Sequence, residues 1–229
     1  VGYLLNQNML GNDDVLTAVE YDEEADAVVV RTQHETDFEE KLAKQTRTSG
    51  CALGTVFGDI METFEDTALD PGARIRTSWL YALTKRINTT PSLYLEAGAI
   101  HGCVLCETDR PLIYMEDVGR HNAVDKIAGY MYLNDISPAG KVFYTTGRLT
   151  SEMVIKTVQM NIPVLISRSG FNACVVDLAR QAILSLIGRA RVNRFVALAR
   201  EHRIVYDADP NAASDEPAGA GRKAATADS

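Results

Sequence analysis

The spacing of hydrophobic and polar positions changes near residue 91 of this 229-residue chain. Upstream, residues 1–10 and 75–89 have helical periodicity, and residues 15–32 alternate as two strands around an acidic turn. This upstream part, residues 1–90, is predicted to be a small region of mixed helix and strand.

Downstream of residue 91, strand and helix patterns alternate. Extended runs at residues 93–106 and 111–118 flank a short polar turn and predict a hairpin. Helices and strands are then expected in turn at residues 121–133, 141–146, 150–160, 163–167, 172–184 and from 186 onward. Strands that alternate with helices of this length predict right-handed crossovers and a largely parallel sheet. Residues 91–206 are therefore predicted to form an α/β domain.

Composition places the chain among globular proteins, since 229 residues with 46% hydrophobic content can bury a core. No apolar run approaches the length that crosses a bilayer, and no secretion leader is recognisable, so no membrane association is expected. Four cysteines do not make a disulfide framework at this length, which predicts a reducing, cytoplasmic setting. The helical pattern is under way at Val1, so residues upstream of it are expected to be missing. Residues 207–229 are small and polar and are predicted to be a disordered tail.

The net charge of −8 is unevenly distributed. Residues 1–40 carry a net charge of −10, residues 41–206 of +5, and residues 207–229 of −3. Such asymmetry suggests that the parts contact different partners. The basic central part is the candidate for binding an anionic ligand, and the alternative is an ordinary solvated surface.

Arginine occurs at every predicted junction where a strand of the α/β domain is followed by a helix or loop. The four junctions are residues 118–122, 145–151, 166–170 and 189–194. Three of them contain glycine, and most carry hydroxyl side chains. The candidate binding residues at these junctions are Arg120, His121, Gly147, Arg148, Ser167, Arg168, Ser169, Arg189, Arg191 and Arg194.

In an open parallel sheet these junctions meet along the carboxyl ends of the strands, where ligands bind. Helix N-termini present free N–H groups there, glycine permits close approach of the backbone, and guanidinium groups match phosphate. The pattern favours a ligand with several phosphates, such as a nucleotide or a nucleotide-bearing cofactor. Nucleic acid fits less well, because the arginines are not clustered on one helix and few aromatic residues lie among them.

Residues 44–58 read KQTRTSGCALGTVFG and place Cys51 among turn-forming and basic residues, which favour a thiolate. This loop resembles the cysteine loop of the formate dehydrogenase accessory sulfurtransferases, the FdhD/NarQ family. Three later motifs are similar to the same family. Residues 116–126 (EDVGRHNAVDK) resemble E-D-x-G-R-H-N-A-x-D-K, residues 147–153 (GRLTSEM) resemble G-R-x-S-S-E-M, and residues 162–169 (IPVLISRS) resemble I-P-V-L-x-S-R-S.

The resemblance extends from Val1 to about Arg194 and implies a sulfur carrier. It implies that Cys51 accepts persulfide sulfur from a cysteine desulfurase and delivers it to the molybdenum of Mo-bis(molybdopterin guanine dinucleotide), which then enters formate dehydrogenase. The implied fold is a cytidine-deaminase-like α/β sheet with flanking helices and a smaller N-terminal α+β region, in a homodimer. The implied cofactor-binding segment is Arg189, Ala190, Arg191, Val192, Asn193 and Arg194, and GDP is the expected analogue of the cargo.

The cysteine loop departs from the family pattern in one respect. Most members have C-x-x-C, whereas Gly54 stands at the second cysteine position here. A second thiol could relay a persulfide by exchange. The alternative function is therefore a cofactor-binding chaperone without sulfur transfer, in which Cys51 is an inert thiol.

Residues 101–106 (HGCVLC) contain zinc-ligand types and raise a zinc-dependent deaminase as a second alternative. On a strand, however, Cys103 and Cys106 point to opposite faces, and the H-x-E and P-C-x-x-C patterns of zinc deaminases are absent. We expect no metal site there. The main interpretation is strand core, and a remote stand-in for the missing loop thiol is another. A pure interaction module is a third alternative, against which the arginine junctions argue.

Overall fold

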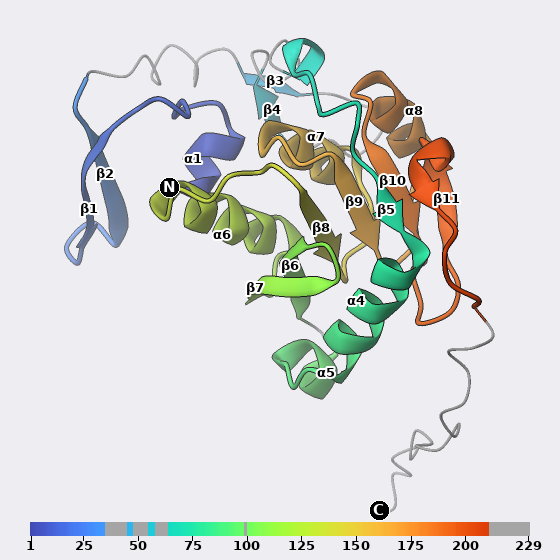
Figure 1. Ribbon diagram of the computed structural model, residues 1–229. Helices are drawn as coiled ribbons and strands as arrows, with labels where there is room; N and C mark the ends of the chain where they lie inside the picture. Colours follow the sequence, from blue (N-terminus) through green and yellow to red (C-terminus); the bar gives the residue numbers. More distant parts are fainter. Residues whose placement is uncertain (35–44, 48–54, 58–63, 99, 211–229) are drawn as a thin grey trace, which may run out of the picture.

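The computed structural model describes residues 1–34, 45–47, 55–57, 64–98 and 100–210. Its main element is a six-stranded sheet with the order β11-β10-β9-β8-β6-β7 (Figure 1). The strands are β6 (His101–Glu107), β7 (Arg110–Asp117), β8 (Lys141–Thr145), β9 (Val164–Ser167), β10 (Ser185–Gly188) and β11 (Val196–Ala199). The helices between them are α6 (Arg120–Leu133), α7 (Ser151–Gln159) and α8 (Ala173–Gln181). The expected α/β alternation is confirmed.

The sheet is mixed, which corrects the expectation of a largely parallel sheet. Strands β8, β9 and β10 are parallel, whereas β6 is antiparallel to both β7 and β8, and β11 is antiparallel to β10. The reason is that β6 and β7 form a hairpin, and β6 is inserted between β7 and β8. Strand β7 consequently runs in the same direction as β8, β9 and β10. The carboxyl ends of these four strands lie at the same end of the sheet. We call this row of strand ends the carboxyl edge.

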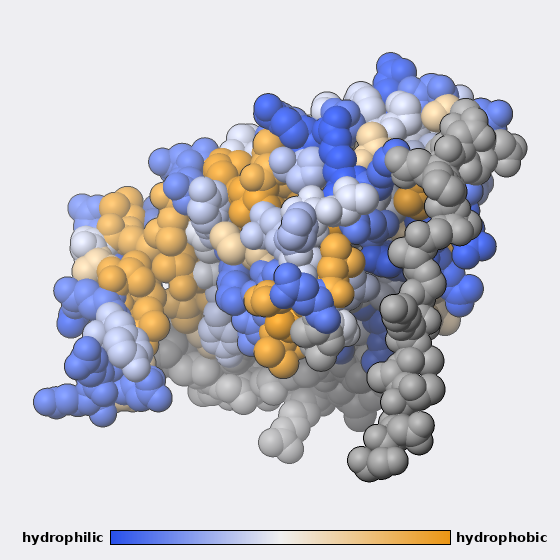
Figure 2. Space-filling view, turned by 90° about the horizontal axis from the view of Figure 1, so that it is seen from below, coloured by the Kyte–Doolittle hydropathy of each residue, from blue (hydrophilic) through white to orange (hydrophobic). Residues whose placement is uncertain are grey.

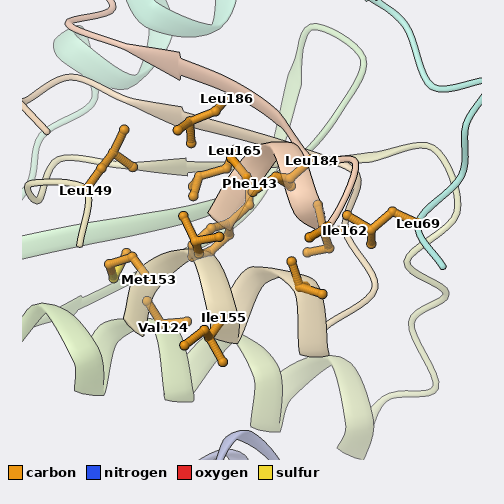
Figure 3. Close-up of a cluster of buried hydrophobic side chains, with 14 of the residues drawn as sticks. Leu69, Val124, Phe143, Leu149, Met153, Ile155, Ile162, Leu165, Leu184 and Leu186 are labelled. Atoms are coloured by element: carbon orange, nitrogen blue, oxygen red, sulfur yellow. The ribbon is translucent and has the colours of Figure 1, made fainter. Parts of the chain in front are cut away.

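Side chains alternate across the sheet and fill two hydrophobic cores. On one face, strand residues such as Phe143, Leu165 and Leu186 pack against α6, α7 and α8 (Figure 3). On the other face, Val104, Tyr144 and Ile166 pack against the helix α4 (Thr77–Thr89). Helix α4 therefore shares a core with the sheet, although the sequence placed it in the N-terminal region. Burying a large aliphatic side chain contributes about 1.5–3 kcal/mol, so these cores supply most of the stability.

Helix α4 begins at Thr77, later than the expected start at residue 75, because Ile75–Arg76 form the strand β5, which pairs with β12 (Ile204–Val205). The carboxylate of Asp207 accepts a hydrogen bond from the backbone N–H of Ser78 at 3.0 Å and further bonds from nearby side chains. Asp207 thus caps α4 and is held in place, although the sequence assigned it to the tail. Residues 211–229 of that tail lie outside the described residues.

The extended run expected at residues 93–106 is wrong in its first part, where α5 (Leu93–Ala97) forms instead. Two side chains cap this short helix. The Ser92 hydroxyl accepts from the Leu95 N–H, and the Glu116 carboxylate accepts from the N–H groups of Leu93 and Tyr94 at 3.1 and 2.8 Å. Since Glu116 comes from β7, local periodicity could not reveal this cap.

The N-terminal part contains the elements expected from the sequence. They are α1 (Gly2–Asn6) and the hairpin of β1 (Leu16–Asp22) with β2 (Ala27–Thr32). The short antiparallel pair β3 (Gln45–Arg47) and β4 (Thr55–Phe57) was not expected, since residues 44–58 show no strand pattern. Helix α1 packs closely on α6, and glycine at position 2 makes this possible. A Cβ added to Gly2 would lie only 1.7 Å from the Asp125 carbonyl oxygen of α6. The hairpin exposes Val19, Tyr21 and Val28, and Figure 2 shows hydrophobic residues at this end of the molecule.

The remaining short element is the 3₁₀-helix η1 (Glu201–Arg203), which precedes β12. Across the part of the chain that the structure describes, no helix combines the length and the hydrophobicity that spanning a membrane requires.

Candidate functional site at the carboxyl edge

The four arginine-bearing junctions lie side by side at the carboxyl edge, as the sequence predicted. Backbone hydrogen bonds connect the loop after β9 to the loops after β8 and β10: Leu149 N–H to Gly170 O at 3.0 Å, and Arg189 N–H to Ser169 O at 3.0 Å. The loop after β8 is connected to the start of β6 by two bonds of 2.9 Å between Thr146 and Gly102. Each junction is therefore held against its neighbour, and the edge is one continuous surface.

Three of the candidate residues shape these loops. The hydroxyl of Ser167 donates to the carbonyl of Gly147 at 2.7 Å, and the hydroxyl of Ser169 donates to the carbonyl of Thr146 at 2.7 Å. A Cβ on Gly147 would lie 3.3 Å from the Cβ of Arg120, so glycine allows the loop to approach α6. The structure assigns these three residues a positioning role, since their hydroxyl donors or backbone are engaged within the loops.

Six arginines lie along the carboxyl edge, and none of them forms an ion pair with a carboxylate among the described residues. They are Arg120 and Arg168, which are half-buried, and Arg148, Arg189, Arg191 and Arg194, which are exposed. Elsewhere, Arg31, Arg76, Arg86, Arg110 and Arg180 each have an acidic partner. Unpaired guanidinium groups gathered on one surface favour an anionic ligand.

The segment 189–194 is not uniform. Ala190 is completely buried, and its side chain belongs to the core that faces α4 and not to the surface of the edge. Arg189 adopts a positive φ of 51° and its guanidinium lies 6.0 Å from the ring centre of Phe171. The backbone N–H of Arg191 donates to the carbonyl of Arg194 at 2.7 Å and closes a turn, with Val192 half-buried and Asn193 exposed.

The three helices that begin at this edge lack side-chain N-caps. Their N-cap residues are Gly119 for α6, Thr150 for α7 and Asn172 for α8, and none of these side chains caps its helix within the described residues. The first turn of a helix has N–H groups without intrahelical acceptors and a partial positive charge. An anion bound at the edge would meet these groups as well as the arginines.

Several buried polar atoms at or near the edge have no hydrogen-bond partner within the described ranges of the chain. They are Arg120 Nε, His121 Nδ1, Tyr144 Oη and Thr150 Oγ1. Buried polar groups are nearly always satisfied in folded proteins, and an unsatisfied one costs about 1–3 kcal/mol. Other such atoms lie elsewhere, on Gln7, Gln159, Arg200 and Arg203. Those near the arginines fit a site that is completed by a polar ligand. Neither Tyr144 nor Thr150 was a candidate from the sequence, because no local pattern marks an unsatisfied atom.

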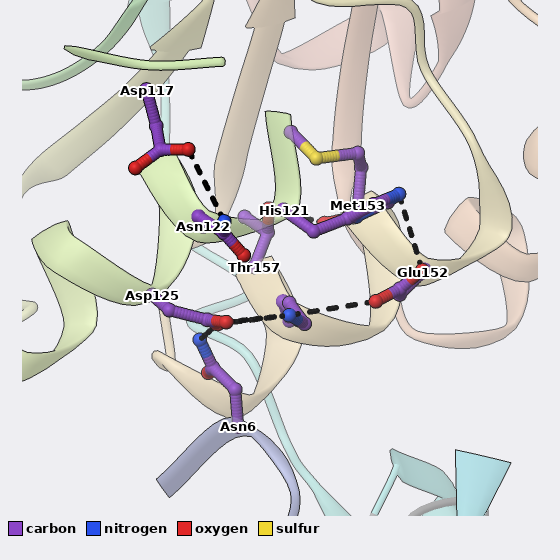
Figure 4. Close-up of polar contacts among 9 residues, drawn as sticks. Asn6, Asp117, His121, Asn122, Asp125, Glu152, Met153 and Thr157 are labelled. Atoms are coloured by element: carbon purple, nitrogen blue, oxygen red, sulfur yellow. Dashed lines mark hydrogen bonds and ion pairs between the residues drawn. The ribbon is translucent and has the colours of Figure 1, made fainter. Parts of the chain in front are cut away.

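A buried ionic network connects the helices α6 and α7, which begin at this edge (Figure 4). Lys156 of α7 lies 2.9 Å from a carboxylate oxygen of Asp125 in α6, and that carboxylate also accepts from the side chain of Asn6 at 2.7 Å. Lys156 also lies 3.5 Å from Glu152, whose carboxylate is 3.2 Å from Nε2 of His121. The network therefore connects α1, α6 and α7 and orients His121 at the start of α6.

The surroundings of His121 favour its neutral form. Burial, together with the charges of Lys156 and Arg120, lowers the pKa of His121 to about 4. Its Nε2 atom faces the Glu152 carboxylate at 3.2 Å, and its Nδ1 atom has no hydrogen-bond partner within the part of the chain that the structure describes. Burial together with the charges of Arg120 and Arg148 likewise lowers the pKa of His101, which places this histidine in the same positive field.

Two of the three described cysteines, Cys103 and Cys106, are poor nucleophiles. Cys103 and Cys106 are completely buried on opposite faces of β6, as the alternation of the strand predicted. Burial raises the pKa of Cys103 to about 12 and also raises the pKa of Cys106, so both remain thiols at neutral pH. Their burial counts against either as a stand-in for the missing loop thiol. Cys51 lies outside the described residues, and among those described no cluster of three or more potential metal ligands is present.

Fold and site together define an α/β protein with an arginine-lined edge that suits a ligand with several phosphates. A family model described as the FdhD/NarQ family matches residues 1–205, and the chain belongs to that family.

Individual relatives agree with this assignment. The chain is 29% identical over 196 residues to a sulfur carrier protein FdhD of Wolinella succinogenes, covering 83% of this chain and 67% of that one. It is 30% identical over 222 residues to a sulfur carrier protein FdhD of Streptomyces avermitilis, covering 90% and 79%. A crystal structure of a protein from Desulfotalea psychrophila, described as a formate dehydrogenase accessory protein, has the same fold. Its TM-score is 0.67 at 23% identity, over 89% of this chain and 76% of that chain. Whether the sheet is of the cytidine-deaminase type stays a prediction.

Proposed function

We propose that this protein is a sulfur carrier that accepts persulfide sulfur on Cys51 from a cysteine desulfurase and transfers it to Mo-bis(molybdopterin guanine dinucleotide). The sulfurated cofactor then serves a formate dehydrogenase. The observation that carries the proposal is the carboxyl edge, where arginines without an acidic partner, helix N-termini whose N-cap side chains form no cap, and unsatisfied polar atoms coincide within the described part of the chain. A cofactor with two guanine dinucleotides supplies several phosphates for such an edge. The names of the curated relatives support the sulfur step.

The loading step is a thiol exchange. The thiolate of Cys51 attacks the outer sulfur of the desulfurase persulfide, a new S–S bond forms at Cys51, and the donor cysteine leaves as a thiolate. No electrons are gained or lost overall. Cys51 is assigned this role by its resemblance to the family loop, and the burial of Cys103 and Cys106 removes two competitors. A homodimer and a cytoplasmic location belong to the same proposal.

Intact-protein mass spectrometry after incubation with a cysteine desulfurase and cysteine tests the sulfur step. We expect a reducible one-sulfur adduct on the wild-type chain and none on Cys51→Ala. The half-buried Cys174 provides a matched control, and Cys174→Ala should load like the wild type. No adduct on the wild type, with a desulfurase shown to be active, would contradict the carrier assignment.

A cofactor-binding chaperone without sulfur transfer is the second candidate. The observation in its favour is Gly54 in place of the second loop cysteine. Formate dehydrogenase activity in cells that rely on this protein separates the two. Loss of activation in Cys51→Ala, with cofactor still bound, supports the carrier. Undiminished activation in Cys51→Ala supports the chaperone.

A further inference from the structure

A cavity of about 390 Å³ lies at the end of the sheet opposite to the carboxyl edge. Helix α8 ends beside it, and β11, which lies next to α8, ends in it (Figure 1). Because Ala199 at the end of β11 pairs with Leu186 near the start of β10, the cavity is at the amino end of β10. Its lining residues are Arg180, Leu198, Ala199, Arg200, Glu201 and His202.

Arg200 lines this cavity from a backbone conformation that favours glycine. Its φ is 58°, in the left-handed region where a Cβ atom is sterically unfavourable. The Nη2 group donates to the carbonyl of Arg180 at 2.8 Å, which holds the guanidinium against the last turn of α8. The Nε atom is buried and has no hydrogen-bond partner among the described residues. An arginine at a position suited to glycine, with one donor unused, requires a physical reason.

Arg203 places a second cation beside Arg200. Its backbone N–H donates to the carbonyl of Arg200 at 3.0 Å, and its side chain is buried, with 2% of the residue exposed. The Nη1 group donates to the carbonyl of Ile183 at 2.8 Å, whereas Nε has no partner. Neither arginine forms an ion pair with a carboxylate within the ranges that the structure describes. A buried cation without a counter-ion is costly, so an anion bound in the adjoining cavity would stabilise this arrangement.

We propose that this cavity binds a small organic carboxylate, which accepts hydrogen bonds from the guanidinium groups of Arg200 and Arg180. The unused Nε–H of Arg200 is the first donor. Arg180 lies 3.6 Å from Asp177, but both side chains are largely exposed, so this ion pair is weak. A guanidinium has five N–H donors in a planar fork that matches the two oxygens of a carboxylate. The last turn of α8 and the end of β11 thus supply one arginine each.

The rest of the lining favours a singly charged ligand with a short apolar body. Glu201 adds a carboxylate, so that, leaving His202 aside, two arginines and one glutamate carry one net positive charge. Glu201 would repel a doubly charged phosphate more strongly than a monocarboxylate. Leu198 is half-buried and Ala199 is buried, and both offer apolar surface to a short hydrocarbon chain. The ligand class is therefore a short monocarboxylate, and its binding is independent of the sulfur-carrier function.

Nuclear magnetic resonance titration of the isotope-labelled chain with butyrate, at constant ionic strength, tests this site. We expect saturable shifts of the backbone amide signals of Arg180 and Glu201. Arg200→Gly removes the guanidinium and suits the positive φ, so the variant should melt close to the wild type. It should bind butyrate about tenfold more weakly, as expected for the loss of a hydrogen bond to a charged group. Arg31→Ala in the β1–β2 hairpin is the control and should bind like the wild type.

Glu201→Gln tests the site in the opposite direction. Glu201 is exposed, so the substitution should leave folding intact. Removing its negative charge should tighten butyrate binding about threefold, the scale of one exposed charge interaction. Glu20→Gln removes an exposed glutamate from the β1–β2 hairpin and should leave the affinity unchanged.

Three results would overturn the site. One is the absence of a saturable shift in the wild type, and another is an equal affinity of the wild type and Arg200→Gly for butyrate. If Arg200→Gly does not fold, an affinity for butyrate that Glu201→Gln leaves unchanged decides against the site. Tighter binding of inorganic phosphate than of butyrate, with the same two amide signals shifting, would refute the ligand class.

Discussion

The helix N-termini of this protein differ in whether a carboxylate of the chain accepts hydrogen bonds from their first-turn N–H groups. At α4, the carboxylate of Asp207 accepts from the Ser78 N–H and from three side chains, and at α5 the carboxylate of Glu116 accepts from two N–H groups. At α6, α7 and α8, the side chain of the N-cap residue makes no cap hydrogen bond, and at α6 the Asp117 carboxylate accepts from the N–H of the N-cap residue Gly119 at 2.8 Å. At α4 and α5 a carboxylate of the chain itself occupies the helix N-terminus, so these caps stabilise the fold and leave no free anion site. The uncapped ones start together at the arginine-lined edge, which keeps their positive ends available to a ligand.

The arginines beside the capped and the uncapped helices also differ in whether they have an acidic partner. Arg76 is paired with Asp207 beside the capped helix α4, whereas Arg120 and Arg148 beside the uncapped helices lack a described acidic partner. Acidic residues do occur near the uncapped helices, but cations occupy them: Asp117 pairs with Lys126 at 2.7 Å, and Glu152 contacts Lys156. Among the residues that the structure describes, the acids near the edge are thus neutralised and its arginines have no acidic partner.

The largest effect is expected from removing the buried cation that connects the uncapped helices. Lys156→Met leaves the carboxylate of Asp125 buried without its ion-pair partner, which should lower the free energy of unfolding by about 3–5 kcal/mol. Chemical denaturation measures this loss. Lys126→Met, which breaks an exposed pair with Asp117, is the matched control and should cost far less. Equal losses in the two variants would contradict a central role for the buried pair.

The next effect concerns binding at the uncapped edge. Arg148→Ala should weaken the binding of GDP and of pyrophosphate by about tenfold, because an unpaired guanidinium is removed from the phosphate site. Arg110→Ala removes an exposed arginine that is paired with Glu107, away from the edge, and serves as the control. Calorimetry at one fixed ionic strength gives both affinities. Similar affinities for the two variants would remove the distinction between paired and unpaired arginines.

Adding a capping carboxylate to α7 tests whether its N-terminus is kept available to a ligand. Thr150→Asp places a carboxylate at the N-cap of α7 and should raise the free energy of unfolding of the unliganded chain by about 0.3–1 kcal/mol. The same change should weaken phosphate binding, since the new carboxylate competes for the first-turn N–H groups. Thr150→Asn, a neutral cap, separates capping from charge repulsion. Tighter phosphate binding by Thr150→Asp would show that the N-terminus of α7 does not face the ligand.

The smallest effect is expected from weakening the cap of α4. Hydrogen bonds from Ser78 and Arg76 lower the pKa of Asp207 to about 2, below its usual value near 4. A lowered pKa means that the carboxylate stabilises the folded chain above about pH 4 and that this contribution is lost as the pH falls towards 2. Asp207→Asn should therefore melt at a lower temperature than the wild type at pH 6, and the two should converge near pH 2. A difference that is independent of pH would exclude the charge as its cause.

Much of the architecture was predictable from local patterns. Hydrophobic periodicity predicts the alternation of strands and helices, the β1–β2 and β6–β7 hairpins, and the opposite faces of Cys103 and Cys106. It can be read from the sequence because it depends only on residues that are neighbours along the chain. The arginine junctions could also be placed on one edge, because each follows a strand that runs in the same direction.

What only the tertiary structure decided depends on residues that are far apart in the sequence. The insertion of β6 between β7 and β8 makes the sheet mixed, and the caps of α4 and α5 come from Asp207 and Glu116, distant residues that no local window contains. The unsatisfied hydroxyl of Tyr144 is likewise invisible in the sequence, where it is one more large residue in a buried strand. Satisfaction of a polar group is a property of its surroundings in space, and only folding assembles those surroundings.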